Sequence, residues 1–165
     1  MNPDSPASQP VEVLAYQPAY KSYFKTLNEA WIRKYFRLEK EDQRVLEDPE
    51  GEILEKGGFI FFVRLHGDIV GTCGLTRNAD GSFELVKMGV DEKAQGKKIG
   101  YQLAKAAIAK AREEGADQVV LYSATLLKPA IGLYRKLGFR EVPLADCHYD
   151  RCDIKMALSL SEENS

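Results

Sequence analysis

Hydrophobic residues recur along this chain with two different periods, and each period marks a different kind of element. Spacings of three and four positions, which place residues on one helix face, occur across residues 18–36, 39–46, 97–114 and 129–137. Short runs rich in β-branched and aromatic residues favour strands and occupy residues 11–16, 58–65, 69–75, 83–90, 118–123, 139–142 and 152–158. Pro18 fits the start of the first helix, and Gly115 fits the carboxyl cap of the long one.

The order of these elements predicts an α+β protein, or α/β by looser naming, built on a single mixed sheet. Residues 83–123 run strand, helix, strand, which implies a parallel pair with a right-handed crossover. The other strands are joined by short turns and pair as hairpins. We therefore expect a mostly antiparallel sheet that contains one parallel pair and is flanked by helices.

Length and composition fit one ordinary globular domain. The chain has 165 residues, is 44% hydrophobic and carries a net charge of -2, which excludes disordered and collagen-like classes and argues against nucleic acid as a partner. We expect a disordered tail over residues 1–10, a folded domain over residues 11–159 and a frayed carboxyl end over residues 160–165. No apolar run approaches the ~20 residues that span a bilayer, so no membrane partner is expected.

The three cysteines, at positions 73, 147 and 152, are too few for a disulfide scaffold, and their odd number suits a reducing compartment. The first residues lack the basic and apolar regions of a signal peptide. These observations predict a cytoplasmic protein. Zinc-binding residue types gather in residues 146–152, but the chain has only one other histidine and no Cys-x-x-Cys pair. We expect no metal there and interpret the segment as a loop before the last strand.

The most informative segment, residues 90–100, joins a predicted buried strand to the start of the long helix. Free backbone N–H groups and the positive end of the helix dipole meet there and attract anions. Gly96 and Gly100 allow close approach to the backbone, and Lys97 and Lys98 add positive charge. The combination suits a pyrophosphate, although neither the Walker A nor the dinucleotide-binding spacing fits. The residues alone leave open an ordinary turn with solvated lysines.

This loop resembles the acyl-CoA motif of the GNAT N-acetyltransferase superfamily, [QR]-x-x-G-x-[GA]. The match covers Gln95, Gly96, Lys97, Ile99 and Gly100, whereas Lys98 stands where a glycine is usual. Residues 126–139 resemble the later family motif A-x-x-x-Y-x-x-x-G-F, and residues 68–75 resemble its central strands. The resemblance covers nearly all of residues 11–159. It implies the GNAT acyltransferase fold, in which the parallel strand pair splays apart.

The resemblance also implies acetyl-CoA as the cosubstrate, with no metal. Backbone N–H groups of the loop would hold the pyrophosphate, and the end of the preceding strand would pair with the pantetheine arm. The residues assigned to this site are Met88, Gly89, Val90, Gln95, Gly96, Lys97, Lys98, Ile99, Gly100, Tyr101, Thr125 and Ala130. An asparagine that often follows the second parallel strand in relatives is replaced here by Ala124 and Thr125.

Amine acetylation needs a base for the acceptor ammonium and an acid for the leaving thiolate. Tyr134 resembles the family tyrosine whose hydroxyl points at the thioester sulfur, which makes it the candidate acid. Glu84 lies six residues before Val90, where the histone-acetylating branch carries its base, and burial would raise its pKa. A solvent-facing glutamate, with ordered water as the base, is the alternative.

Candidates for the acceptor pocket lie outside these motifs. Trp31 and Tyr35 fall in the helical region that covers the pocket in relatives, although an aromatic stripe usually belongs to the core. Tyr149 lies in the loop that borders the acceptor side in relatives. Lys87 shares a strand with Glu84, and we expect its side chain to face solvent.

Together these residues predict an N-acetyltransferase that moves acetyl from acetyl-CoA to a primary amine by direct attack in a ternary complex. No cysteine stands in a nucleophile motif, so no covalent enzyme intermediate is expected. The acceptor partner is a small-molecule or protein amine, and exposed strand edges are compatible with a homodimer. The alternative is a non-catalytic acyl-CoA-binding sensor or interaction module, which the departure at Lys98 favours.

Overall fold

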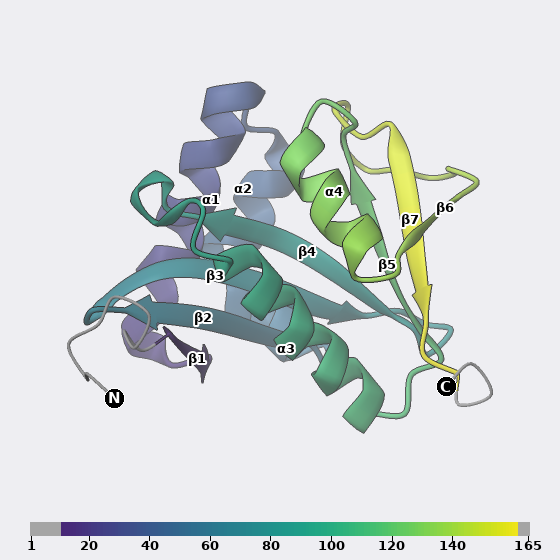
Figure 1. Cartoon of the computed structure of the whole chain (residues 1–165), viewed down its shortest axis with the longest axis horizontal. Helices are drawn as coiled ribbons and strands as arrows, with labels where there is room; N and C mark the ends of the chain where they lie inside the picture. Colours follow the sequence, from purple (N-terminus) through teal and green to yellow (C-terminus); the bar gives the residue numbers. More distant parts are fainter. Residues whose placement is uncertain (1–10, 162–165) are drawn as a thin grey trace.

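The computed structural model describes residues 11–161 and shows one central sheet with helices on both faces (Figure 1). Within this range, seven strands lie in the order β1-β2-β3-β4-β5-β7-β6. Their bounds are Val11–Ala15 (β1), Phe59–Leu65 (β2), Asp68–Arg77 (β3), Phe83–Val90 (β4), Gln118–Ser123 (β5), Arg140–Val142 (β6) and Ile154–Ser159 (β7). Strands β4 and β5 are parallel, and the other neighbouring pairs are antiparallel. The predicted mixed sheet is confirmed.

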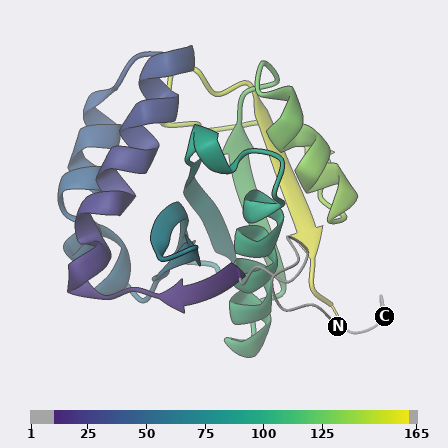
Figure 2. The same cartoon turned by 60° about the vertical axis from the view of Figure 1, so that its left-hand side comes forward.

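Four α-helices pack on this sheet within the described range. They are Lys21–Tyr35 (α1), Lys40–Glu47 (α2), Ile99–Glu113 (α3) and Lys128–Lys136 (α4), with 3-10 turns at Pro18–Tyr20 (η2) and Glu92–Ala94 (η4). Helices α1 and α2 cover one face, and α3 and α4 cover the other (Figure 2). A short π-helix, Glu50–Leu54 (η3), follows α2 and is absent from the predicted elements, because five residues are too few to show a helical period.

Each face of the sheet has its own buried cluster. Phe83 and Leu85 of β4 pack with α3 and α4, whereas Val86 packs toward α1 and η3. This alternation follows from the two-residue period of a strand. Strand β4 therefore presents side chains to both halves of the core. A gap in the sheet beside β4 connects its two faces.

The sheet opens beside β4. Strands β4 and β5 pair only from Phe83↔Val119 to Leu85↔Leu121, and they diverge beyond that point. Lys87 has φ +52°, and the β3 register runs from Gly89 directly to Val86, which leaves Lys87 and Met88 as a bulge. A bulge bends its strand and increases the twist, so it accounts for the splay that the resemblance implies.

The folded unit extends slightly beyond the predicted limit at its carboxyl end. Leu160 is buried, and its N–H donates to the carbonyl of Asp117 at 2.7 Å, so this residue is packed rather than frayed. The predicted tail over residues 1–10 and the final residues 162–165 lie outside the described residues. None of the helices in residues 11–161 has the length and hydrophobicity that a membrane crossing requires.

Candidate active site

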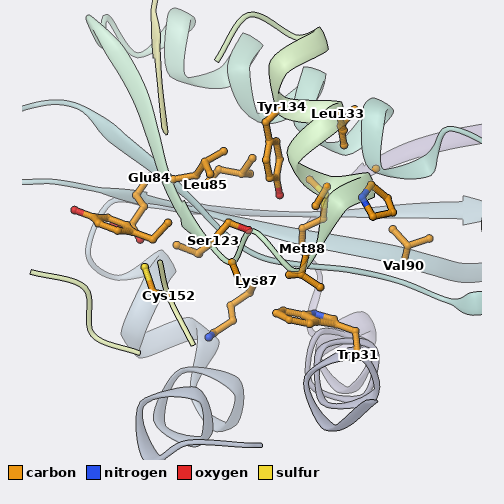
Figure 3. A pocket seen from close by; sticks show the side chains of 18 of the residues that line it. Trp31, Glu84, Leu85, Lys87, Met88, Val90, Ser123, Leu133, Tyr134 and Cys152 are labelled. Carbon is orange, nitrogen blue, oxygen red and sulfur yellow. The ribbon is translucent and has the colours of Figure 1, made fainter. Parts of the chain in front are cut away.

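A cavity of about 1080 Å³ lies where β4 and β5 separate (Figure 3). One end, which we call the α3 end, is bordered by the loop at residues 94–101 and by α4. The other, the α1 end, is bordered by α1, α2 and the loop between β6 and β7. The cavity therefore joins the two faces of the sheet through the gap that the bulge creates.

The loop at the α3 end exposes its backbone to the cavity. Gly96 has φ +81°, and a Cβ there would meet no atom within 4 Å. Lys98 precedes α3 and has φ +62°, in the left-handed region, so α3 begins at Ile99 rather than at the predicted Lys97. The usual glycine at this position of the motif thus has a conformational reason, because a left-handed backbone costs a residue with a side chain about 1–2 kcal/mol.

The start of α3 has the properties of an anion site. Its first N–H groups have no intrahelical acceptor, and its first turn carries no acidic residue. A Cβ at Gly100 would lie 3.3 Å from Leu133 and 3.5 Å from Met88, so this glycine keeps the helix close to α4 and β4. Backbone donors, a helix dipole and the ammonium of Lys98 then meet at one end of the cavity.

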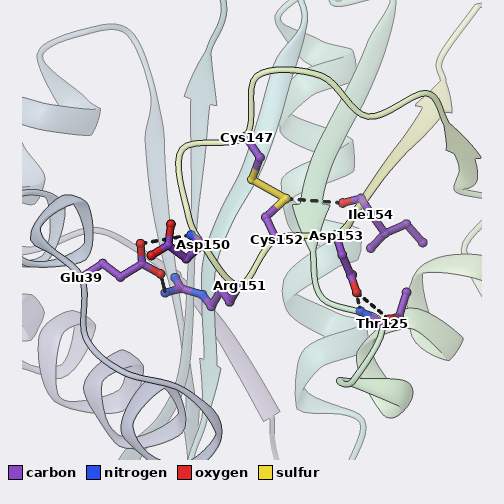
Figure 4. Close-up of a disulfide and its surroundings, with 8 residues drawn as sticks. All are labelled: Glu39, Thr125, Cys147, Asp150, Arg151, Cys152, Asp153 and Ile154. Atoms are coloured by element: carbon purple, nitrogen blue, oxygen red, sulfur yellow. Dashed lines mark hydrogen bonds and ion pairs between the residues drawn. A yellow bond between two sulfur atoms is a disulfide. The ribbon is translucent and has the colours of Figure 1, made fainter.

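Most of the predicted cofactor residues line this cavity. They are Met88, Val90, Gln95, Gly96, Lys98, Ile99, Gly100, Tyr101 and Ala130. Gly89, Lys97 and Thr125 are not among the lining residues. Gly89 instead faces α1, where a Cβ would lie 3.0 Å from the carbonyl oxygen of Leu27. Thr125 donates from its N–H and its hydroxyl to Asp153, each at 2.8 Å (Figure 4), so the structure gives no support to its predicted cofactor contact.

Tyr134 projects from α4 into the cavity. Its ring packs edge-on against Phe139, with centroids 5.8 Å apart, and the residue is 7% exposed. Its hydroxyl points into the space between Met88 and Ser123 (Figure 3) and has no hydrogen-bond partner within residues 11–161. Burial raises the pKa of Tyr134, so the hydroxyl keeps its proton and can donate it.

Glu84 lines the same cavity from the opposite face of β4. It lies at a position where β4 still pairs with β5, opposite Val120. Burial raises the pKa of Glu84, and the charges of His148, Lys155 and Lys87 partly offset this rise. Glu84 and Tyr134 thus border one cavity, as the predicted base and the predicted acid should. Their catalytic roles stay predictions.

Lys87 does not face solvent, so that expectation is wrong. Its residue exposure is 8%, and its Nζ lies 2.6 Å from a carboxylate oxygen of Asp42 and 2.8 Å from the hydroxyl of Tyr149. The bulge explains the difference, because a left-handed residue leaves the regular alternation of the strand. Burial lowers the pKa of Lys87, and the attraction to Asp42 opposes that effect.

Asp42 is the centre of a buried ionic cluster made of Asp42, Lys87, Tyr149 and Arg151. Both terminal nitrogens of Arg151 bind its carboxylate, at 2.9 and 2.7 Å, and the N–H of Glu39 donates to it at 2.9 Å. Burial alone would raise the pKa of Asp42, but Arg151 and Lys87 outweigh it and hold the value at about 2. The carboxylate is therefore ionised and ties α2, β4 and the β6–β7 loop together.

The β6–β7 loop is closed by a disulfide between Cys147 and Cys152 (Figure 4). The expectation of reduced cysteines is thus wrong for this pair, while Cys73 is buried and free. The loop is further held at Asp150, whose carboxylate pairs with Arg37 at 2.6 Å. Within residues 11–161 no group of three His, Cys, Asp or Glu side chains is placed to hold a metal ion, and both cysteine sulfurs of residues 146–152 are in the disulfide.

The predicted acceptor residues meet at the α1 end. Trp31 is half-buried and donates from its ring N–H to Asn28 at 2.9 Å. Tyr35 is 48% exposed, and Tyr149 lies in the cavity wall with its hydroxyl 2.8 Å from the Nζ of Lys87. The structure therefore brings all three candidates to one end of one cavity, and one of them, Tyr149, belongs to the ionic cluster.

Comparison with known proteins is consistent with this geometry. A sequence profile described as the Acetyltransferase (GNAT) family matches residues 16–139, most of the chain. The chain belongs to the GNAT acetyltransferase family. The solved acetyltransferase of this family from Staphylococcus aureus Mu50 is 26% identical, with a TM-score of 0.82 over 92% of this chain and 100% of that one. The Salmonella typhimurium yncA protein, solved with acetyl-CoA, is 19% identical, with a TM-score of 0.74 over 92% and 95% of the two chains.

Two curated relatives of this GNAT protein extend beyond the region of similarity. The mycothiol acetyltransferase of Saccharomonospora viridis is 44% identical over 59 residues, 36% of this chain and 19% of the relative. The uncharacterized N-acetyltransferase YjgM of Escherichia coli is 34% identical over 112 residues, 64% of this chain and 66% of YjgM. The match therefore spans less than two thirds of either relative.

Sequence motifs of this GNAT protein locate the α3 end but not the ionic cluster. Asp42 and Arg151 lie 109 positions apart in the chain, and no local pattern links them. Two weak features point to the cluster: a lysine in a buried strand, and an aspartate three residues after Glu39, where it forms a capping box for α2. Either feature has an ordinary structural explanation on its own.

Proposed function

We propose that this GNAT protein is an N-acetyltransferase that moves acetyl from acetyl-CoA to a primary amine within a ternary complex. The main support is Tyr134, a protonated hydroxyl that has no hydrogen-bond partner among the described residues and is aimed into the cavity between the splayed strands. A thiolate leaving group needs such a donor. The family membership and the acetyl-CoA in the similar yncA structure agree with this choice of cosubstrate.

The α3 end fits acetyl-CoA in shape and charge. The first N–H groups of α3 and the open backbone at Gly96 suit the pyrophosphate, and Lys98 adds a cation. Beyond Leu85, β4 has no strand partner on its β5 side within the described part of the chain, so the backbone of residues 88–90 can form hydrogen bonds with the amides of a pantetheine arm there. When bound, acetyl-CoA supplies the activated acyl group.

The chain's own residues account for the two proton transfers. Glu84, with its raised pKa, accepts a proton from the acceptor ammonium directly or through water. The freed amine attacks the thioester carbonyl carbon, so a C–N bond forms and the C–S bond breaks. Tyr134 gives its proton to the departing sulfur, and the second proton that the nitrogen loses as the amide forms returns to the Tyr134 oxygen through solvent, so one proton leaves overall, by way of Glu84. The products are an N-acetyl amide and the CoA thiol, and no covalent enzyme intermediate is required.

Calorimetric titration with acetyl-CoA tests the first part of the proposal. We expect micromolar binding to the wild type and none to Gly96→Asp, whose added carboxylate would repel the pyrophosphate. Gly67→Asp is the matched control, because Gly67 also has a left-handed φ, +85°, and open space around its Cβ position, but lies in the β2–β3 turn. Loss of binding in both variants, or no binding by the wild type, would overturn the proposal.

Thiol release with a panel of primary amines tests the second part. We expect turnover by the wild type and a drop of about 10²-fold in Tyr134→Phe with acetyl-CoA affinity retained. Acetyl-CoA binding without turnover of any amine would instead favour the alternative, a non-catalytic acyl-CoA sensor. That alternative rests on Lys98, whose side chain stands where relatives carry glycine.

A further inference from the structure

The α1 end of the cavity holds two buried cations that bind one fully buried carboxylate. Lys87 and Arg151 both bind Asp42, and their side chains are only 4% and 11% exposed. Glu39, whose side chain is 12% exposed, lies 3.4 Å from Arg151, so this guanidinium has two carboxylate partners. Lys87 has Asp42 as its only ion-pair partner among residues 11–161. A buried ammonium that shares its counter-ion favours a second anion.

Hydrogen-bond donors at this end are also unused. The ammonium of Lys87 has three N–H groups, and within residues 11–161 it donates to Asp42 and Tyr149 only. The hydroxyl of Tyr149 accepts from Lys87, and its own hydrogen has no acceptor in the described part of the chain. Both side chains line the cavity. Partly buried donors without acceptors favour ligand oxygens at this position.

The other charged groups around this wall do not cancel that preference. Glu41 lines the cavity, but its carboxylate is held by Arg44. Glu84 lies on β4 three residues before Lys87, and its carboxylate has no hydrogen-bond partner in residues 11–161. A carboxylate that can bind a cation and donors that can bind a carboxylate thus line one cavity, which is the arrangement that a zwitterion requires.

We propose that the acceptor is an amine that also carries a carboxylate, such as a free α-amino acid, and that Lys87 and Tyr149 bind this carboxylate. The proposal rests on the proposed function and names its substrate class. The acceptor ammonium faces Glu84, and its carboxylate receives hydrogen bonds from Lys87 and Tyr149. Figure 3 agrees with this order, because Lys87 extends away from Tyr134 across the gap. The acceptor thus lies between the acid at Tyr134 and the ionic cluster.

Matched pairs of acceptors test this assignment. Thiol release is measured with L-alanine, L-leucine, L-phenylalanine, L-lysine and L-glutamate, and with the carboxamide of each. For at least one pair, we expect kcat/KM of the free acid to exceed that of its amide by about 10- to 100-fold, the range of a charge-assisted hydrogen bond. The preference should be expressed mainly in KM.

Variants of the wall then identify the responsible groups. Tyr149→Phe removes one hydroxyl and should reduce the acid-to-amide ratio about 10-fold. Lys87→Met should abolish the preference, and its urea unfolding shows whether the variant is folded. Tyr23→Phe is the control, because Tyr23 is 40% exposed on α1 and is not among the cavity-lining residues, so loss of its hydroxyl should leave the ratio unchanged.

Three outcomes would overturn the assignment. They are amides that react as well as the acids, a ratio that Tyr149→Phe does not alter, and no free acid that reacts while simple amines or peptides do. In each of these, calorimetry on the same sample still shows acetyl-CoA binding, so the proposed function survives. If acetyl-CoA itself does not bind, both the proposed function and this assignment fail.

Discussion

The two ends of the cavity are built from different parts of the polypeptide. At the α3 end, the anion-binding donors come from the backbone of one continuous segment, residues 94–101, where Gly96 leaves the backbone open to a ligand. The α1 end is a side-chain structure assembled from α1, α2, β4 and the β6–β7 loop. A ligand that the whole family shares can be bound by main-chain geometry, which tolerates many sequences. A ligand that differs between members requires side chains, which can change one at a time.

The two ends also handle charge differently. Lys97 and Lys98 at the α3 end are exposed, and their charge is screened by water and salt. At the α1 end Lys87 and Arg151 are buried and fixed by Asp42. Salt should therefore weaken interactions at the first end more than at the second. Substitutions that act on one end and spare the other are the sharpest way to test this contrast.

The largest effect on the free energy of unfolding is expected from replacing Asp42. Asp42→Asn leaves Lys87 and Arg151 buried without their carboxylate and should lower the free energy of unfolding by about 3–5 kcal/mol, measured by urea denaturation. Because the folded-state pKa of Asp42 is lowered from 3.8 to about 2, its contribution is present above pH 3.8 and is lost as the pH falls through about 2.

Glu41→Gln is the control for Asp42→Asn. Glu41 lies one residue earlier in α2, but it pairs with the exposed Arg44 at the surface, so the change should cost less than about 1 kcal/mol. Equal destabilisation by the two variants would show that the ionic cluster has no special role in stability.

The next largest effect is expected on the acetylation rate when Glu84 is replaced. Glu84→Gln should lower kcat about 10²-fold because the amide cannot accept a proton. Since burial raises the pKa of Glu84 above 4.5, the wild-type rate should rise with pH through that raised value, and the variant should lose this ascending limb. A variant that keeps the limb and the rate would assign proton removal to water instead.

Removal of the disulfide should have a smaller effect on stability and should affect the acceptor site without affecting acetyl-CoA binding. It closes a loop with a sequence separation of 5, so Cys147→Ser/Cys152→Ser should lower the free energy of unfolding by about 2 kcal/mol. The same loop carries Tyr149 and Arg151 into the cavity wall. We therefore expect a higher KM for the acceptor and an unchanged Kd for acetyl-CoA, both in this variant and in wild type treated with dithiothreitol. A raised Kd for acetyl-CoA with an unchanged acceptor KM would refute this separation.

The same contrast explains how much the sequence could predict. The α3 end and Tyr134 can be predicted from the sequence because their residues lie within short, continuous motifs whose spacing reflects local backbone geometry. The fold followed from hydrophobic periods that each strand and helix shows alone. The ionic cluster depends on contacts between residues 45 and 109 positions apart. A lysine on a strand is interpreted as solvent-facing until the bulge that redirects it is known.

The smallest expected effect on stability is at Lys98, where two variants distinguish the cost of the left-handed backbone from the role of the side-chain charge. Lys98→Gly relieves the left-handed φ of +62° and should raise the free energy of unfolding by about 0.5–1 kcal/mol, because relief of the strain exceeds the added flexibility of glycine. Lys98→Ala removes the same ammonium but keeps the strain, so this variant should not be more stable than the wild type.

If the ammonium binds phosphate, both variants weaken acetyl-CoA binding in calorimetry, and the loss of affinity is smaller at high salt. If instead the side chain narrows the approach to the backbone, glycine improves binding and alanine improves it less. An identical response of stability in the two variants would contradict a conformational reason for glycine at this position.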